Sequence, residues 1–211
     1  MSRHKLIIHD TMQARYHYTD ALKKFLIERD TSAAVALFDE SLMLDSTYAP
    51  ALYQKAAIEL GRDRQKAMEY ARRAYEKDSM NRWYTALYAQ TLVFTERYDE
   101  ALHLYRRLMK IDAKNPDNYR IVAILYQQRQ QPYAAISVLD SADMRFGKNP
   151  YLTGLKRHLL LATRQYERAI DEAQQAVDIA PYDQQSLLDL GNTYAAAGKD
   201  SLAQAHSFCD I

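Results

Sequence analysis

Small apolar residues recur along the chain at a nearly constant interval. Six alanines mark the repeat, with one spacing of 33 residues followed by four of 34 residues: Ala34, Ala67, Ala101, Ala135, Ala169 and Ala203. Larger residues keep the same phase, with aromatic residues three positions before the alanine and bulky residues four positions after it: Tyr98, Tyr166, Phe38, Tyr105 and Leu139. Because several positions agree over many copies, the pattern indicates repeats of one supersecondary unit.

A second row of small residues lies twelve positions before the phased alanines. Ala89, Ala123 and Gly191 follow this row, whereas Leu22 and Arg157 depart from it. Only 5 Gly and 5 Pro interrupt a chain rich in Ala, Leu, Gln, Glu, Lys and Arg, which lose little side-chain freedom in a helix. The composition therefore favours an all-α fold.

Two segments of the chain are near copies of one turn and helix start, Arg97–Leu102 and Gln165–Ile170. Leu190-Gly191-x-x-Tyr194 is followed by Ala203, and the preceding unit closes on Pro181. These motifs resemble the tetratricopeptide repeat (TPR) family. The resemblance implies an all-α, right-handed superhelical solenoid of antiparallel helix-turn-helix repeats, with a small residue on each helix where the two backbones approach.

The repeat predicts an N-terminal extension over residues 1–14 and a single solenoid over residues 15–211. Its units are 15–48, 49–81, 82–115, 116–149, 150–183 and a partial unit 184–211. Pro132 stands where the turn aromatic is expected, but a proline suits the first turn of a helix because its missing N–H leaves nothing unpaired there. Each unit buries its apolar face only by stacking on its neighbours.

The charge of the chain gives no general attraction to nucleic acid or to an acidic membrane, because 28 Lys and Arg nearly cancel 27 Asp and Glu. The basic runs at 62–66 and 72–73 alternate with or adjoin other polar residues, which is typical of a solvated helix face. The lone Cys209 excludes an internal disulfide, and the six histidines show no metal-ligand spacing, so we expect no metal and no cofactor.

The N-terminal segment contains only a short apolar run, Leu6–Ile8, far below the length of a signal-peptide core or a membrane span. We therefore expect no membrane insertion of this chain and, by default, a cytoplasmic location. A leader removed before this sequence begins would instead imply an extracytoplasmic location.

The TPR resemblance implies that the first helix of each unit lines a concave groove. Carried over position by position, it assigns these residues to a partner-binding groove: Tyr53, Trp83, Leu87, Gln90, Phe94, Arg120, Ile121, Ile124, Tyr151 and His158. The same positions include Asp117 and Leu155. The apolar centre of this set favours an extended peptide or a helix as ligand, since such side chains dominate binding at interfaces. Packing between helices is the alternative role of these aromatic residues.

No catalytic set is visible, because no nucleophile with a base, no carboxylate pair and no phosphate-binding glycine loop can be assigned to one pocket. The sequence therefore predicts a non-enzymatic protein–protein interaction scaffold. A docking or sensory TPR region of a longer enzyme or signalling protein is the alternative. Self-association through open ends of the solenoid is also consistent with the pattern.

Overall fold

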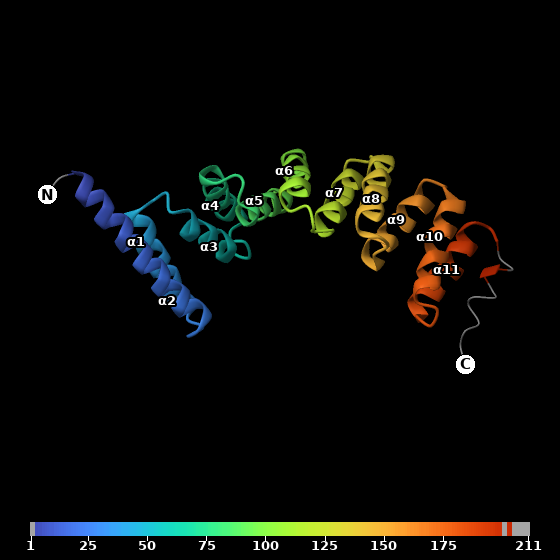
Figure 1. The fold of residues 1–211 in the computed structure, drawn as a ribbon, viewed down its shortest axis with the longest axis horizontal. Helices are drawn as coiled ribbons and strands as arrows, with labels where there is room; N and C mark the ends of the chain where they lie inside the picture. The colour runs from blue at the N-terminus through green and yellow to red at the C-terminus, as the bar shows by residue number, and fades with distance from the viewer. Residues whose placement is uncertain (1–2, 200–201, 204–211) are drawn as a thin grey trace. The chain divides into compact units, whose positions relative to one another are not determined.

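The computed structural model describes residues 3–199 and 202–203, with side chains from His9 onward. Every regular element in these ranges is an α-helix, and consecutive helices form antiparallel hairpins (Figure 1). The predicted all-α class of helix-turn-helix repeats is therefore confirmed. In the last predicted unit, residues 200–201 and 204–211, which include Cys209, lie outside the described residues.

The chain divides into two compact units, Met1–Asp112 and Ala113–Ile211. Unit 1 contains α1 (Arg3–Leu26), α2 (Thr31–Leu44), α3 (Ala49–Glu59), α4 (Arg64–Lys77), α5 (Arg82–Phe94) and α6 (Tyr98–Ile111). Unit 2 contains α7 (Asp117–Gln128), α8 (Pro132–Phe146), α9 (Pro150–Ala162), α10 (Tyr166–Ile179) and α11 (Gln184–Ala196). Because each unit is described on its own, one continuous superhelix over residues 15–211 stays a prediction.

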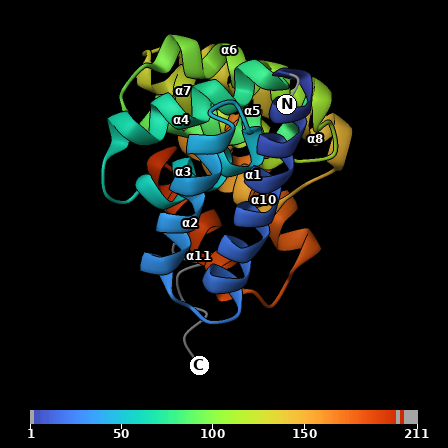
Figure 2. The ribbon, with the colours of Figure 1, turned by 90° about the vertical axis from the view of Figure 1, so that its left-hand side faces the viewer.

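The first helix begins earlier than the first predicted repeat. Because α1 starts at Arg3, residues 3–14 of the predicted N-terminal extension are helical and continue into the first hairpin. Figure 2 shows α1 and α2 side by side, and the buried Ser41 hydroxyl on α2 donates to the Ala14 carbonyl oxygen at 2.7 Å. Part of the predicted extension therefore packs as a repeat helix.

Polar side chains begin many of the helices. The carboxylates of Asp30, Asp63 and Asp183 and the amide oxygens of Asn81 and Asn149 accept hydrogen bonds from backbone N–H groups in the first turn that follows each of them. Such caps satisfy N–H groups that have no partner inside the helix. As expected, Pro132 occupies the first turn of α8.

The phased alanines form the centre of the helix packing. The alanines at 34, 67, 101, 135 and 169 are fully buried, and Ala203 is 8% exposed. Phe38 and Leu139, four positions after such an alanine, are also fully buried. In the second row, Ala89 and Ala123 are 0% exposed. The small residues thus lie where helices approach each other.

Charged residues replace the small residue of this second row in two hairpins. Lys55 on α3 is 5% exposed, and its Nζ lies 2.9 Å from Asp39 Oδ1 on α2. Arg157 on α9 has its guanidinium 2.9 Å from Asp189 Oδ1 on α11. Since each cation reaches a carboxylate of a neighbouring hairpin, the departures from the pattern become contacts between repeats.

None of the helices in the described part of the chain is both long enough and apolar enough to cross a membrane.

Candidate partner-binding site

A pocket of about 640 Å³ lies between α7 and α9, the first helices of two consecutive hairpins of unit 2. Side chains of both helices and of the residues that precede them form its walls: Pro116, Asp117, Arg120, Ile124, Asn149, Tyr151, Leu152 and Leu155. Its volume falls in the range of ligand-binding clefts, roughly 300–1,000 Å³.

The wall of the pocket is mainly apolar. Leu152 is 2% exposed and gives the pocket a buried apolar surface, while Ile124 and Leu155 are half-buried. Tyr151 is 83% exposed, so its ring is available to a partner at the edge of the pocket. An exposed aromatic beside a buried aliphatic surface is a typical anchor arrangement for a protein ligand.

The polar groups of the pocket are held in defined positions. Arg120 Nε lies 2.6 Å from Asp117 Oδ1, one helical turn earlier on α7. No hydrogen bond from the terminal guanidinium nitrogens of Arg120 is present among the described residues. The Asn149 amide oxygen accepts from the Tyr151 backbone N–H at 3.0 Å and so caps α9. The pocket therefore combines an apolar wall with donors that could hold a backbone carbonyl or a carboxylate.

Three of the residues predicted for the groove in unit 2 meet in this pocket: Arg120, Ile124 and Tyr151. Ile121 is half-buried on α7 and His158 is exposed on α9, and neither lines the pocket. Asp117 and Leu155, also predicted for the inner face, line the pocket as well. Pro116, Asn149 and Leu152 line it without having been predicted. These three lie before or at the start of the first helices, where the repeat pattern alone assigns no inner position.

The predicted groove residues of unit 1 have mixed environments. Trp83 is 59% exposed on α5, and the Arg82 guanidinium lies 4.6 Å from the centre of its ring. Phe94 is 40% exposed, and Arg64 lies 5.7 Å from its ring centre. Gln90 is exposed. These side chains are accessible to a partner, and both aromatics are covered on one side by a cation.

The other two predicted residues of unit 1 are used in packing. Tyr53 on α3 is half-buried, with its ring centre 5.6 Å from that of Tyr84 on α5. Leu87 is 8% exposed and belongs to the core of unit 1. Because Trp83 lies in unit 1 and Ile121 in unit 2, their association in one groove stays a prediction.

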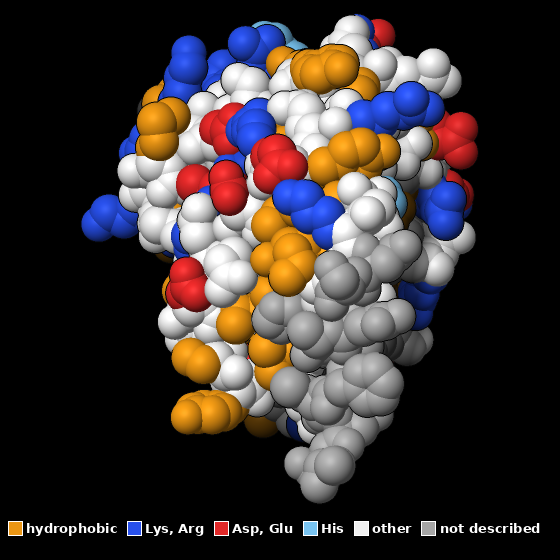
Figure 3. Space-filling model, turned by 90° about the vertical axis from the view of Figure 1, so that its right-hand side faces the viewer, with side chains coloured by type: hydrophobic (Ala, Val, Ile, Leu, Met, Phe, Trp, Pro, Cys, Tyr) orange, Lys and Arg blue, Asp and Glu red, His pale blue; other side chains and the backbone are white. Residues whose placement is uncertain are grey.

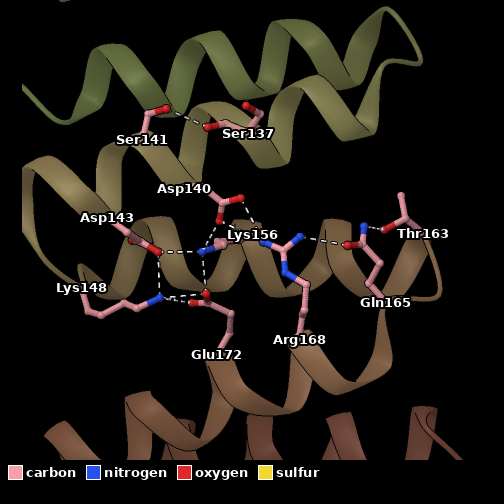
Figure 4. Close-up of polar contacts among 10 residues, drawn as sticks. All are labelled: Ser137, Asp140, Ser141, Asp143, Lys148, Lys156, Thr163, Gln165, Arg168 and Glu172. Atoms are coloured by element: carbon pink, nitrogen blue, oxygen red, sulfur yellow. Dashed lines mark hydrogen bonds and ion pairs between the residues drawn. The ribbon is translucent and has the colours of Figure 1, made fainter.

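A cluster of charged side chains that the repeat pattern did not predict joins α8, α9 and α10 (Figure 4). Lys156 on α9 is 4% exposed, and its Nζ lies 2.6 Å from Asp140 and 2.7 Å from Asp143 on α8. It also pairs with Glu172 on α10, which is 6% exposed. Lys148, just before α9, lies 2.7 Å from both Asp143 and Glu172.

The ion pairs of this cluster favour the charged forms of its members. Burial acts to lower the pKa of Lys156, but hydrogen bonds with three carboxylates, those of Asp140, Asp143 and Glu172, outweigh it and raise that pKa above its ordinary value. Burial acts to raise the pKa of Asp140, yet hydrogen bonds from Lys156 and Arg168 hold it below its ordinary value. The cluster therefore fixes α9, one wall of the pocket, to its two neighbours.

The position of Glu172 in the repeat is the one sequence feature that indicates this cluster. Glu172 follows Ala169 by three positions, so it shares the buried side of α10 with that alanine. A charged residue on a buried helix side requires a partner. The identity of that partner depends on tertiary packing. Within the described residues, no group of His, Cys, Asp and Glu is arranged to hold a metal ion.

Solved structures of TPR proteins have the same fold. A TPR protein from Parabacteroides merdae is 16% identical, with a TM-score of 0.71 over 90% of this chain and 77% of that one. PilF of Pseudomonas aeruginosa is 19% identical, with a TM-score of 0.65 over 94% of this chain and 90% of that one. YrrB, a TPR protein with an unusual peptide-binding site, is 16% identical, with a TM-score of 0.61 over 80% of this chain and 88% of that one.

At these identities the structures establish the fold alone, and they confirm the TPR resemblance. No curated protein matches the sequence of the chain. A family model does match: that of the ChAPs, the Chs5p-Arf1p-binding proteins, aligns with residues 48–205. Because this match covers most of the sequence, the chain belongs to the ChAPs family.

Proposed function

We propose that this protein is a non-enzymatic interaction scaffold that binds a segment of a partner protein in the pocket between α7 and α9. The observation that carries the proposal is the meeting of Arg120, Ile124 and Tyr151 in one mainly apolar pocket. The repeat positions of these three residues, taken alone, already predict that they share a groove.

In the proposed complex, the partner buries an apolar side chain against Leu152, Leu155 and Ile124. Tyr151 covers that side chain from the edge of the pocket, where its large exposed ring can lose contact with water on binding. Arg120 donates to a backbone carbonyl or a carboxylate of the partner. Buried aromatic and aliphatic anchors supply most of the affinity at such interfaces, and polar groups fix the register.

The family name supplies the first partners to test. ChAPs are named for binding Chs5p and Arf1p, and we propose that a protein of this kind is the ligand of this chain. YrrB, which shares the fold, has a peptide-binding site, and this supports a peptide segment as the bound element. Purified Arf1p and Chs5p, and peptides selected from a displayed library, are therefore the probes.

The test compares two exposed tyrosines of unit 2. Tyr151 lines the pocket and is 83% exposed, whereas Tyr182 is 95% exposed and lies outside it. In calorimetric titrations, Tyr151→Ala should weaken binding of the selected probe by about tenfold or more, the effect of losing an interface anchor. Tyr182→Ala should leave affinity within about twofold. Unchanged affinity in Tyr151→Ala would refute the pocket as the site.

A third variant tests the unit 1 half of the predicted groove. Trp83 is the only tryptophan of the chain, so its fluorescence reports directly on its surroundings. If the ligand also contacts unit 1, binding should change the emission of Trp83, and Trp83→Ala should weaken binding without altering the circular dichroism spectrum. If the emission spectrum of Trp83 does not change when the ligand binds, the site is restricted to unit 2.

A further inference from the structure

A second pocket of unit 2, about 370 Å³ in volume, lies among α9, α10 and α11. Thr153, Gly154 and Arg157 line it from α9, Ala173, Ala176 and Ile179 from α10, and Gln185, Ser186 and Asp189 from α11, together with Lys148, Pro150, Ala180 and Asp183. None of these residues lines the pocket between α7 and α9. It is therefore a separate cavity.

Small residues create the space in this pocket. Ala173 and Ala176 present only methyl groups from α10, and Gly154 presents no side chain from α9. A Cβ added at Gly154 would meet no atom within 4 Å, so close packing does not explain the glycine. Ile179, 66% exposed, adds an apolar edge, and Figure 3 shows hydrophobic side chains gathered on the side that carries α10 and α11.

Thr153 is the unusual polar residue of this pocket. The residue is 6% exposed, and among the described residues no hydrogen bond is made by its hydroxyl. Thr85 occupies the matching position two repeats earlier, is 0% exposed, and donates to the carbonyl oxygens of Asn81 at 2.9 Å and Ser79 at 3.1 Å.

Thr153 is one of the residues that line the pocket. In the described part of the chain, no side-chain nitrogen or oxygen that is fully closed off lacks a partner, so the small accessible surface of Thr153 includes its oxygen. A hydroxyl both donates and accepts hydrogen bonds. An unbonded hydroxyl in a mostly buried position is therefore free for a ligand that enters the pocket.

The charged residues of the pocket already have partners. Arg157 lies 2.9 Å from Asp189, and its guanidinium also contacts the Thr193 hydroxyl at 3.3 Å. Asp183 accepts hydrogen bonds from both the backbone N–H and the hydroxyl of Ser186.

Lys148 is held by Asp143 and Glu172 at 2.7 Å. The charges of the wall that lie away from solvent, those of Lys148, Arg157 and Asp189, are already in ion pairs, whereas Asp183 is exposed to water and hydrogen-bonded to Ser186. An ionic ligand inside the pocket would therefore lose its hydration without gaining a free buried counter-charge. The pocket therefore favours an uncharged ligand.

We propose that this pocket binds a small uncharged amphipathic molecule, with an aliphatic body against Ala173, Ala176 and Ile179 and a hydroxyl, carbonyl or amide head bonded to Thr153. The ligand supplies the partner that the Thr153 hydroxyl lacks. The small residues supply the room for the aliphatic body. This site is independent of the proposed partner-binding pocket.

The test uses 1-hexanol as the probe, with the full-length protein followed by ¹H–¹⁵N NMR. Saturable shifts should appear at the amides of α9, α10 and α11 that surround Thr153. Thr153→Val keeps the shape of the side chain but removes the hydroxyl, and it should weaken hexanol binding by about tenfold, the loss of one buried hydrogen bond. Ala176→Phe, which fills the pocket, should abolish the shifts.

Matched controls separate this result from general effects on the fold. Thr85→Val should bind hexanol like the unaltered protein but unfold at a lower temperature, because it loses hydrogen bonds that Thr153→Val does not lose. Tyr151→Ala should also bind hexanol normally, so failure of the partner-binding proposal remains distinguishable. Non-saturable shifts, or equal hexanol affinity in Thr153→Val and the unaltered protein, would overturn the proposal.

A side chain of a protein partner could carry the same chemistry as a free molecule. Hexanol is therefore titrated again in the presence of a saturating partner probe. Simultaneous binding supports the free small molecule, whereas loss of the hexanol shifts would assign the pocket to the partner and overturn the proposal.

Discussion

At the scale of single residues, the phased alanines show how closely side-chain size is set by packing. Ala34 on α2 is fully buried, whereas Ala36 on the same helix is exposed. The two differ in position but not in chemistry or helix propensity. The buried alanine should therefore tolerate no larger side chain.

Enlarging these two alanines gives a direct test. Ala34→Leu should lower the free energy of unfolding by about 1–3 kcal/mol, because the extra atoms overpack a closed helix contact. Ala36→Leu should change it by less than about 0.5 kcal/mol, as is usual for surface positions. Urea unfolding followed by circular dichroism measures both, and equal effects would contradict the assigned packing role.

Lys156 supports a second prediction at this scale. Lys156→Met removes the central cation of the cluster and leaves buried carboxylates with fewer partners, so stability at pH 7 should fall by about 3 kcal/mol, the lower end of the range for breaking a buried ion pair because Lys148 remains. Lys110→Met, at an exposed position on α6, is the control and should have little effect.

The pH dependence of the same variant follows from the two pKa shifts. The pKa of Asp140 is lowered in the folded protein, so its contribution is present above its ordinary pKa of 3.8 and is lost as the pH falls through the folded value. The pKa of Lys156 is raised, so its contribution is present below 10.5 and is lost as the pH rises through the folded value. The stability difference between the unaltered protein and Lys156→Met should therefore shrink in strong acid. A constant difference from pH 7 to pH 2 would contradict the role of these carboxylates.

At the scale of helices and turns, most of the hairpin turns share one backbone feature, which is absent from the turn between α3 and α4 among the described residues. Residues with positive φ occur at Arg29, Glu96, Gln130 and Arg164, and Gly198 occupies the matching place at a φ of 73°. The last four of these positions are 34 residues apart, which is the repeat spacing. The repeat therefore extends to the turn conformation, and glycine is the residue best suited to it.

Gln130 gives the prediction for these turns. Gln130→Gly should raise the free energy of unfolding by up to about 1 kcal/mol, because a φ of 57° strains a residue that carries a Cβ. Gln128→Gly, at the last residue of α7, should lower it by less than about 0.5 kcal/mol, because glycine is a poor helix former but the full cost applies only inside a helix. Thermal unfolding midpoints of the two variants should thus move in opposite directions, and a shift in the same direction would argue against the turn assignment.

At the scale of the whole molecule, the two compact units each contain three of the buried, phased alanines. In repeat proteins, stability is approximately a sum of contributions from repeats and their nearest neighbours. Residues 1–112 and 113–211, produced separately, should therefore each show a helical spectrum and a cooperative thermal transition. A unit that lacks a transition would show that it depends on contacts with the other.

Much of the fold was predictable, because each repeat needs a small residue at the same helix contact and the sequence therefore shows this requirement several times. The alanine row predicted the helix contacts, and Pro132 was correctly assigned to a first helical turn. The start of α1 was not predicted, since no repeat precedes residue 15 to extend the pattern. For the candidate site, the repeat positions of Arg120, Ile124 and Tyr151 were informative because the helix period relates equivalent positions to one face.

The sequence by itself determined the helical class, the repeat length and the buried alanine positions, because these depend on periods within one chain segment. Only the tertiary structure decided which charges pair and where cavities remain. The carboxylate partners of Lys156 come from two other helices, and the unbonded Thr153 differs from Thr85 through its neighbours, not through its own identity. Such contacts depend on how separate helices pack against each other, and a local sequence pattern does not predict this packing.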